Sequence, residues 1–282
     1  MKTKNDSAAP LVGFIGAGNM ARSLAGGLVR NGWAPARLLL SDPQAAQRQA
    51  VEQALGLSVL ADNSEVARRA EILVLAVKPQ ALSAVARELA AAVQQTRPLV
   101  ISIAAGVRGA DIEHWLGGDL AVVRVMPNTP ALIGSGASGL HANARVTEAQ
   151  RDQAESILRA VGVTVWVEDE QLIDVVTALS GSGPAYFFLV MEALEAAAIK
   201  AGLDPSQARL LTLETAVGAS KMALEGGDEP AQLRQRVTSP GGTTEAALKV
   251  MEDGGLRRIF DDAIAAATRR ARELGDLLGK NS

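Results

Sequence analysis

A glycine-rich segment near the start of the sequence has the spacing of a dinucleotide-binding loop. It reads Gly16-Ala17-Gly18-Asn19-Met20-Ala21, a Gly-x-Gly-x-x-Ala pattern that follows an apolar run ending at Ile15. In such a loop the first glycine permits a tight turn, the second lets the backbone approach a pyrophosphate, and the small third residue lets helix and strand pack closely. The helix that follows presents free N–H groups and a positive dipole end to phosphate. The segment predicts an NAD(P) site if it joins a strand to a helix.

Two charged residues further along could contact the same cofactor. Asp42 lies 24 residues after Gly18, where an acidic residue would bind the ribose 2′-hydroxyl of NAD, and the alternative is a helix N-cap ahead of Pro43. A 2′-phosphate would be repelled by that carboxylate and would prefer Ser41 and an arginine, so the choice between NAD and NADP stays open. The candidate arginines are Arg22, Arg37 and Arg48. Lys78 could contact phosphate or ribose, or could be a solvated charge.

Two later segments place small and hydroxylated residues ahead of expected helices. They are SGSGP at residues 180–184 and TSPGGTTE at residues 238–245. Each would present bare backbone amides at a helix N-terminus, which can hold a carboxylate without an arginine. The alternative is ordinary capping by Ser and Thr. Their presence in one chain with a cofactor loop favours a small-ligand site.

The composition excludes several other kinds of chemistry. The 282 residues include no cysteine, so a disulfide, a thiolate nucleophile and a Cys-based zinc site are excluded. The two histidines, His114 and His141, are given no role, and no metal site is expected. The net charge is −3 without a long basic block, so nucleic-acid binding is not expected.

The elements that must position these residues follow from the apolar pattern. Short apolar runs alternate with helical patterns in the first half, which predicts a Rossmann domain with a doubly wound, mainly parallel sheet. The expected strands are residues 11–15, 37–40, 72–77, 99–103, 121–125 and 163–167. Ligands of such sheets bind beyond the carboxyl ends of the strands. The Gly/Ser-rich loop from Met126 through Gly139 could line the nicotinamide pocket or simply leave the sheet.

After residue 169 the strand signal disappears, and Gly and Pro punctuation predicts helices alone. The expected helices are residues 184–201, 205–225, 230–237, 244–252 and 256–278. We therefore expect a Rossmann domain at 1–168 and an all-α domain at 169–282. Because helix 184–201 is apolar around most of its circumference, a partner subunit is expected to cover it, the alternative being a monomer's core helix. Glu192 and Glu195 on this helix could form interface pairs or reach solvent.

The expected location is the cytoplasm. The first seven residues are polar and lack the apolar core of a signal peptide. The richest apolar stretch, residues 185–198, is interrupted by Glu192 and Glu195, so no membrane-spanning helix is expected.

Five motifs together resemble the pyrroline-5-carboxylate reductase family, which catalyses the last step of proline biosynthesis. They are FIGAGNM at 14–20, AVKPQ at 76–80, MPNTP at 126–130, SGSGPAY at 180–186 and TSPGGTT at 238–244. The resemblance covers nearly the whole chain. It implies a Rossmann domain, a helical dimerisation domain, a homodimer assembled into a larger ring such as a decamer, and NADPH as cofactor with NADH possible.

The resemblance also implies site residues. The family residue at the imine falls on Thr244, the predicted catalytic residue, and the substrate loop falls on residues 239–243. The predicted substrate-binding residues are Ser239, Gly241, Gly242, Thr243 and Ser182. The predicted cofactor-binding residues are Ile15, Gly16, Gly18, Asn19, Met20, Ser41, Asp42, Asn63, Ala76, Val77, Lys78, Pro79 and Ala104.

The residue inventory suits reduction of 1-pyrroline-5-carboxylate, a cyclic imine, because the cofactor carries the hydride and the protein supplies orientation. The hypothesis is that amides of residues 242–244 bind the carboxylate and that the Thr244 hydroxyl bonds the ring nitrogen. One alternative is a 3-hydroxyacid dehydrogenase, which would need a general base such as Lys200 or Lys221. Another is a nucleotide-sensing protein without turnover.

Overall fold

The computed structural model describes residues 9–279, and the polar stretch at 1–7 that bears on a signal peptide lies outside them. The chain divides into two compact units. The nucleotide unit comprises residues up to Ser182 together with the chain from Ala266 onward, and the helical unit is Gly183–Ala265. The predicted division was at residue 168. The nucleotide unit differs from the predicted Rossmann domain in that it also includes residues 169–182 and the part of the last helix that begins at Ala266.

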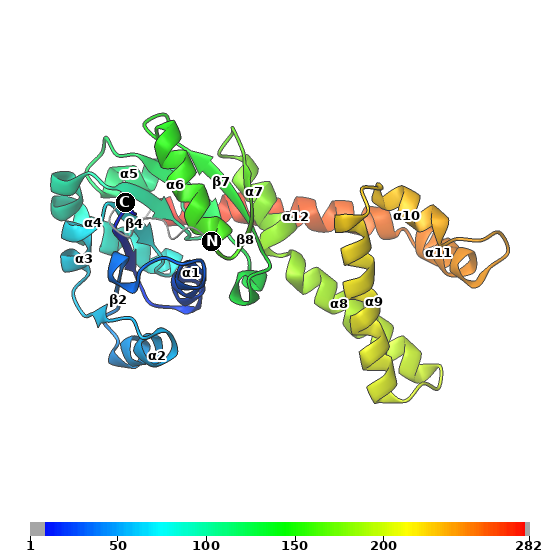
Figure 1. Ribbon diagram of the computed structural model, residues 1–282. Coiled ribbons are helices and arrows are strands. Elements are labelled where there is room, and N and C mark those ends of the chain that lie inside the picture. The colour runs from blue at the N-terminus through cyan, green and yellow to red at the C-terminus, as the bar shows by residue number, and fades with distance from the viewer. Residues whose placement is uncertain (1–8, 280–282) are drawn as a thin grey trace. The chain divides into compact units, whose positions relative to one another are not determined.

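The nucleotide unit contains an eight-stranded sheet in the order β3-β2-β1-β4-β5-β6-β7-β8 (Figure 1). The strands are β1 Val12–Ile15, β2 Leu38–Ser41, β3 Val59–Leu60, β4 Ile72–Leu75, β5 Leu99–Ser102, β6 Val122–Met126, β7 Gly136–Ala142 and β8 Gly162–Trp166. All neighbouring strands are parallel except β6 and β7. The order reverses between β1 and β4, so the predicted doubly wound, mainly parallel sheet is confirmed.

Helices cover this sheet. They are α1 Asn19–Arg30, α2 Ala45–Leu55, α3 Asn63–Arg69, α4 Pro79–Thr96, α5 Gly109–Trp115, α6 Glu148–Arg159, α7 Leu172–Val176 and the second part of α12 Leu256–Gly279. Successive residues of β1 alternate between two apolar clusters, since Phe14 packs in one and Ile15 in the other. Each fully buried side chain of this kind stabilises the fold by about 1.5–3 kcal/mol relative to exposure.

Two strands were not predicted. β3 has only two residues, and β7 begins within the last part of the expected 126–139 loop and extends beyond it to Ala142. The β7 sequence GASGLHA has little β propensity because it contains two glycines. These glycines lie where a side chain would collide with a neighbouring element. A Cβ on Gly136 would lie 2.9 Å from the Val161 carbonyl oxygen, and one on Gly139 would lie 2.6 Å from Val176 Cγ1. Tertiary packing thus makes a strand where local pattern predicts a loop.

The expected helix start at Pro184 agrees with α8, which begins at Gly183, but the expectation of a bare helix N-terminus at residues 180–184 is wrong. Leu172–Lys200 is one helical run of 29 residues, consisting of α7, a π-helical segment Thr177–Gly181 and α8 Gly183–Lys200. The Ser182 amide donates to the Thr177 carbonyl oxygen at 2.9 Å, so it is not a bare helix N-terminus. Pro184 lacks the N–H that would bond Ser180, and it sits inside the run rather than at its beginning.

The helical unit consists of α8, α9 Pro205–Glu225, α10 Pro230–Arg236, α11 Thr243–Asp253 and the start of α12. These helices agree with prediction to within about two residues, the usual scatter of helix ends. Glu252 at the end of α11 joins Arg234 of α10 at 3.2 Å and Arg257 of α12 at 2.8 Å. The hydrogen bond from Arg257 lowers the pKa of Glu252. These ion pairs are exposed and link α10 and the end of α11 to the start of α12.

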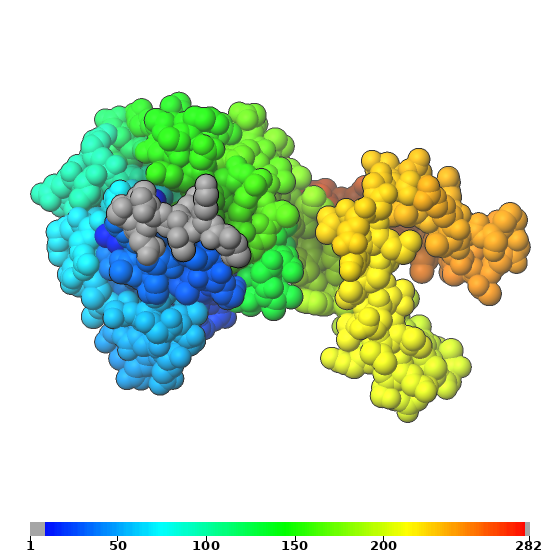
Figure 2. Space-filling model, viewed as in Figure 1, coloured from blue at the N-terminus to red at the C-terminus, as the bar shows by residue number. Residues whose placement is uncertain are grey.

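Apolar side chains of α8 and α9 lie open to solvent, and the α9 surface is yellow in Figure 2. Phe187, Phe188 and Leu189 are each about two-thirds exposed, and Ala208 alone is buried among the described α9 residues. By length and composition alone Leu172–Lys200 is apolar enough to cross a membrane, a property that the core helix of a soluble protein can share, so the expectation of no membrane-spanning helix is not contradicted. A single copy of this unit therefore leaves a large apolar surface without a cover.

Candidate active site

The glycine-rich loop lies between β1 and α1, the context that its prediction requires. Gly16 has a φ of +95°, and a Cβ there would lie 2.9 Å from the Ala76 carbonyl oxygen. Gly18 is the N-cap of α1, where no side chain of residues 9–279 forms a capping bond. Apart from Gly18 itself and its two chain neighbours, no heavy atom of the described chain lies within 4 Å of the position of a Gly18 Cβ. The first turn of α1 thus borders open space that suits a pyrophosphate.

The parallel register brings the other predicted cofactor residues to the same edge. Ile15 is aligned with Ser41 and with Leu75, and Leu75 is aligned with Ser102. The loops after β1, β2, β4 and β5 therefore begin side by side at the point where the strand order reverses, as expected for a ligand site of this fold. Lys78 is the N-cap of α4, with Pro79 in its first turn.

Ser41 and Asn63 form one polar contact beneath this edge. The Ser41 hydroxyl is fully buried and donates to Asn63 Oδ1 at 2.8 Å, while the Ser41 carbonyl accepts from Gly16 N at 2.8 Å. Asn63 is half-buried in the first turn of α3. Ala104 is buried after β5. The Ser41 carbonyl thus holds the glycine-rich loop through Gly16 N, and Asn63 is the more solvent-exposed residue of the pair.

Asp42 is not the N-cap of α2, and its carboxylate is bonded within the protein. Its Oδ2 accepts from Ala17 N at 3.0 Å, and its Oδ1 accepts from Gln44 N at 2.9 Å. The N-cap of α2 is Gln44, and Asp42 is only 9% exposed. One carboxylate oxygen therefore holds the glycine-rich loop against the end of β2, and the other holds the turn that leads into α2.

One of the three candidate arginines is anchored beside Asp42. Arg48 Nη1 donates to the Asp42 carbonyl at 3.0 Å and to the Pro43 carbonyl at 2.9 Å. Arg37 lies in the turn that precedes β2, at the strand's other end. Arg22 donates to Asn19 Oδ1 in the first turn of α1. Arg48 is thus the candidate arginine held at the carboxyl end of β2.

The segment after β6 is bonded to two other elements through the side chain of Asn128. It forms a 3-10 turn at Thr129–Ile133, and the Asn128 side chain makes two bonds. Asn128 Oδ1 accepts from Ala137 N at 2.9 Å, and its Nδ2 donates to the Ser180 carbonyl at 3.1 Å. Asn128 thus ties β7 and the π-helical segment to the end of β6, a role that the sequence analysis missed.

In the helical unit, residues 239–242 form a tight turn ahead of α11. Gly242 N donates to the Ser239 carbonyl at 3.0 Å, and Gly241 has a φ of +72° directly after Pro240, which is the pattern of a type II turn. Gly242 is the N-cap of α11, with no side-chain capping bond from the described residues. A Cβ on Gly242 would lie 2.6 Å from Ser239 Oγ, so only glycine fits without a shift.

Thr243 and Thr244 occupy the first turn of α11. Thr243 is exposed and Thr244 is half-buried. Glu245 Oε2 accepts from Gly241 N at 2.8 Å and leaves the first-turn amides uncapped by side chains of residues 9–279. The loop can therefore present several N–H donors and a hydroxyl to a small anion.

The remaining ionisable candidates do not join either loop. Among residues 9–279 no group of three His, Cys, Asp or Glu side chains could hold a metal ion. His141 Nδ1 lies 3.2 Å from the Val167 carbonyl, and His114 lies in α5. Lys221 pairs with Glu225 on the surface of α9, and Lys200 is exposed at the end of α8.

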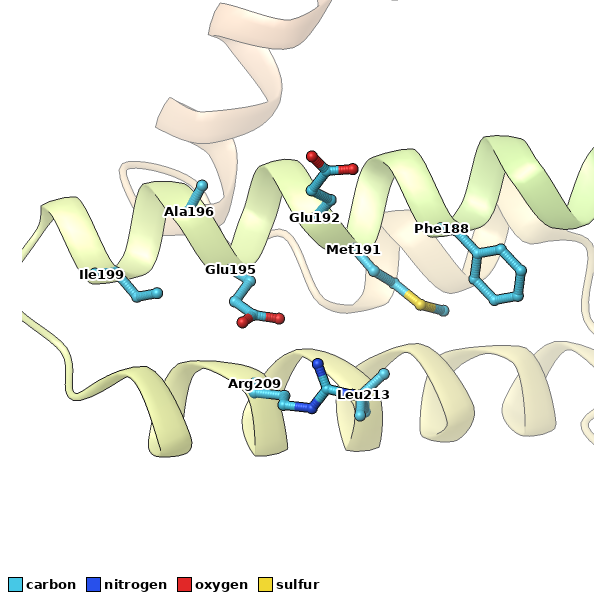
Figure 3. Close-up of a pocket in the computed structure, with 8 residues that line it drawn as sticks. All are labelled: Phe188, Met191, Glu192, Glu195, Ala196, Ile199, Arg209 and Leu213. Carbon is cyan, nitrogen blue, oxygen red and sulfur yellow. The ribbon is translucent and has the colours of Figure 1, made fainter.

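A groove of about 520 Å³ lies between α8 and α9 (Figure 3). Glu195 extends from α8 toward α9, and Arg209 extends from α9 toward α8. Glu192 points away from α9 in the same view. The apolar part of the lining is Phe188, Met191, Ala196, Ile199 and Leu213. The groove belongs to the exposed apolar surface of the helical unit, and of the charged side chains that line it Glu195 and Arg209 extend toward the facing helix.

Two family models match the chain. One is described as pyrroline-5-carboxylate reductase dimerisation and matches residues 170–274. The other is described as NADP oxidoreductase, coenzyme F420-dependent, and matches residues 11–106. The two matches fall in the two predicted domains.

Characterised relatives match over nearly their full lengths. Pyrroline-5-carboxylate reductase from Pseudomonas aeruginosa is 51% identical over 96% of this chain and 99% of its own. The solved structure of a pyrroline-5-carboxylate reductase from Coxiella burnetii is 47% identical with a TM-score of 0.91, covering 94% of this chain and 98% of that chain. The Plasmodium falciparum pyrroline carboxylate reductase with NADP bound is 30% identical with a TM-score of 0.83, over 94% of this chain and 98% of that chain.

Proposed function

Because this chain belongs to the pyrroline-5-carboxylate reductase family, we propose that its two loops divide the work of one reaction. The reaction is the reduction of 1-pyrroline-5-carboxylate to proline with NAD(P)H in proline biosynthesis. The glycine-rich loop of the nucleotide unit holds the cofactor, and the loop at residues 238–244 holds the substrate. The observation that carries this assignment is that both loops end in helix N-termini without a side-chain cap among the described residues.

The space beside Gly18 and the polar groups near it suit the binding of NAD(P)H. Gly18 leaves room where a side chain would stand, and the amides of α1 point into that room. Asn63 and Lys78 contribute a polar and a cationic group at the same edge. When bound, NAD(P)H supplies the hydride, and the protein's part is to hold the reacting carbon in place.

The substrate carboxylate is held by amides of residues 242–244, and the Thr244 hydroxyl bonds the ring nitrogen and keeps the imine oriented for attack at carbon. Ser239, Gly241 and Thr243 shape the loop. Ser182 stays in the proposed substrate site through its hydroxyl, since its amide already bonds Thr177.

The direct test is oxidation of NADPH, then of NADH, by purified protein on addition of 1-pyrroline-5-carboxylate. Substrate-dependent loss of reduced-nicotinamide absorbance is expected with both cofactors, faster with NADPH. Hydroxyacid oxidation without imine reduction would instead favour the dehydrogenase alternative, which the exposed positions of Lys200 and Lys221 do not support. Cofactor binding without turnover would favour a sensor.

Arg48 is proposed to favour NADPH. Its guanidinium is held beside the end of β2, where the adenosine ribose is expected, and the carboxylate of Asp42 is turned to Ala17 and Gln44. Arg48→Ala should lower kcat/KM for NADPH about tenfold and that for NADH by less than about threefold, because a phosphate loses its charge partner and a hydroxyl does not. Arg37→Ala at the other end of β2 is the control. Equal losses with both cofactors would rule out this role.

The family match makes the helical unit a dimerisation domain, and a homodimer accounts for its apolar surface. The assembly into a larger ring such as a decamer is our proposal. Mass photometry at nanomolar and micromolar concentrations should give the dimer as the smallest species and a multiple of it at higher concentration. A protein that stays a monomer throughout would contradict both levels of assembly.

The cytoplasm is the proposed location. The apolar run Leu172–Lys200 is assigned to the subunit interface, because the matched dimerisation model begins at residue 170 and covers it. Recovery of the protein in the membrane fraction after high-salt washing would contradict this proposal.

A further inference from the structure

The π-helical segment Thr177–Gly181 is followed closely by Pro184, which interrupts the regular pattern of helix hydrogen bonds. In a regular helix the amide of residue 184 would bond the carbonyl of residue 180, but Pro184 has no N–H. The Ser180 carbonyl, which is half-buried, therefore needs another donor, since a carbonyl withdrawn from water and left unpaired is costly. The Asn128 Nδ2 supplies it at 3.1 Å.

The same asparagine is fixed at its other end. Asn128 Oδ1 accepts from Ala137 N at 2.9 Å, so the amide orientation is determined by one donor and one acceptor. Asn128 follows β6 closely, at the sheet edge where ligands of this fold bind. It thus links that edge directly to the π-helical segment.

The segment also packs on the end of β6. A Cβ on Gly181 would lie 2.5 Å from the Met126 Cε, so the backbone at Gly181 lies against the last residue of that strand. Ser182 N bonds to the Thr177 carbonyl five residues back, which shifts the residues after it by one position relative to an α-helix. Short π-type turns are frequent at functional sites.

We propose that Asn128 is a positioning residue for hydride transfer, which holds residues 180–182 in π-helical register against the carboxyl end of β6. It acts through the Ser180 carbonyl and not by touching the reacting atoms. The inference rests on the proposed placement of the cofactor at this sheet edge. Misplacement of a supporting segment by about 1 Å can cost up to about 100-fold in rate, so the register matters for kcat.

Asn128→Asp tests this with the smallest change. The aspartate keeps an acceptor for Ala137 N but replaces the donor to Ser180 with an oxygen, so it removes one bond and repels the carbonyl. We expect kcat to fall at least about tenfold, with the Kd for NADPH changed by less than about threefold. Unchanged kcat would overturn the inference.

Asn143→Asp is the matched control for stability. Asn143 follows β7 and lies at the amino end of β6, where its Oδ1 accepts from Val122 N at 3.2 Å and its Nδ2 donates to the Leu120 carbonyl at 2.9 Å. Its substitution also exchanges a donor for an acceptor in a half-buried network. It should lower Tm as Asn128→Asp does while kcat per folded enzyme is kept. A similar loss of kcat in both variants would show that destabilisation alone is responsible.

Pro184→Ala tests whether kcat depends on the π-helical register of residues 180–182 or only on a hydrogen bond to the Ser180 carbonyl. The alanine introduced by this substitution has an N–H that can bond Ser180, so the run can revert to regular α-helix and Tm should stay level or rise. In Asn128→Asp/Pro184→Ala, we expect Tm to recover while kcat stays low, because the carbonyl is satisfied but the π register is lost. Recovery of kcat together with Tm would overturn the inference. Loss of NADPH binding in the variants alone would also overturn the inference, whereas failure of the unaltered protein to bind NADPH would instead contradict the proposed cofactor edge.

Discussion

Replacing Thr244 with alanine should lower kcat/KM for 1-pyrroline-5-carboxylate about 100-fold and leave the Kd for NADPH unchanged. Removing one preorganised hydrogen-bonding group at a reacting centre typically costs about 100- to 1,000-fold in rate. Thr244 lies half-buried in the first turn of α11, in the helical unit, whereas the glycine-rich loop belongs to the nucleotide unit. The substitution therefore removes the proposed substrate contact and leaves the glycine-rich loop as it is.

Two further variants at the same position sharpen the test. Thr244→Ser keeps the hydroxyl and should retain most of the activity, while Thr244→Val keeps the shape and should fall as far as alanine. Steady-state kinetics with varied imine and NADPH, and binding of NADPH by fluorescence titration, give the two quantities. Full activity in the alanine and valine variants would end the assignment of Thr244 to the ring nitrogen.

The cofactor loop was predictable because its determinants are local. A turn between strand and helix needs Gly16 at positive φ, and an open helix N-terminus needs a small residue at Gly18, so residue type and spacing are sufficient. The role of Asp42 was not predictable, because it depends on the amide of Ala17, which is distant in sequence but adjacent across the sheet. Local pattern identifies the loop, whereas tertiary contact decides which acceptor supports it.

The helical unit shows the same limit in another form. Helix ends marked by Gly and Pro, such as those of α9, were expected at nearly the right residues. At Pro184 the same reasoning located the start of α8 to within one residue but missed the helical residues just before it, because proline also occurs inside a helical run where a side chain elsewhere takes the freed carbonyl. The donor Asn128 precedes that proline by 56 residues, and no sequence period connects the two.

Gly18→Ala should weaken NADPH binding at least about tenfold while the Tm of the cofactor-free protein changes by less than about 2 °C. The backbone at Gly18 has a φ of −70°, which any residue adopts, and no heavy atom of the described residues lies within 4 Å of the new Cβ. The added methyl group therefore meets nothing within the described part of the protein. Its effect falls on a molecule that approaches the α1 N-terminus closely, and a cost of about 1.4 kcal/mol is a tenfold change in Kd.

Gly16→Ala provides the contrast that makes the result interpretable. At Gly16 the φ of +95° and an Ala76 carbonyl oxygen 2.9 Å from the Cβ position impose strain on the protein alone, so Tm and NADPH binding should fall together. Thermal unfolding with and without NADPH, measured on both variants, separates the two cases. If the Gly18→Ala variant binds NADPH as the parent does, the pyrophosphate does not approach this backbone, and the cofactor site would have to be placed elsewhere on the sheet edge. If that variant folds normally and binds poorly, the cofactor lies against the α1 N-terminus, because no heavy atom of the described residues is close enough to account for the loss.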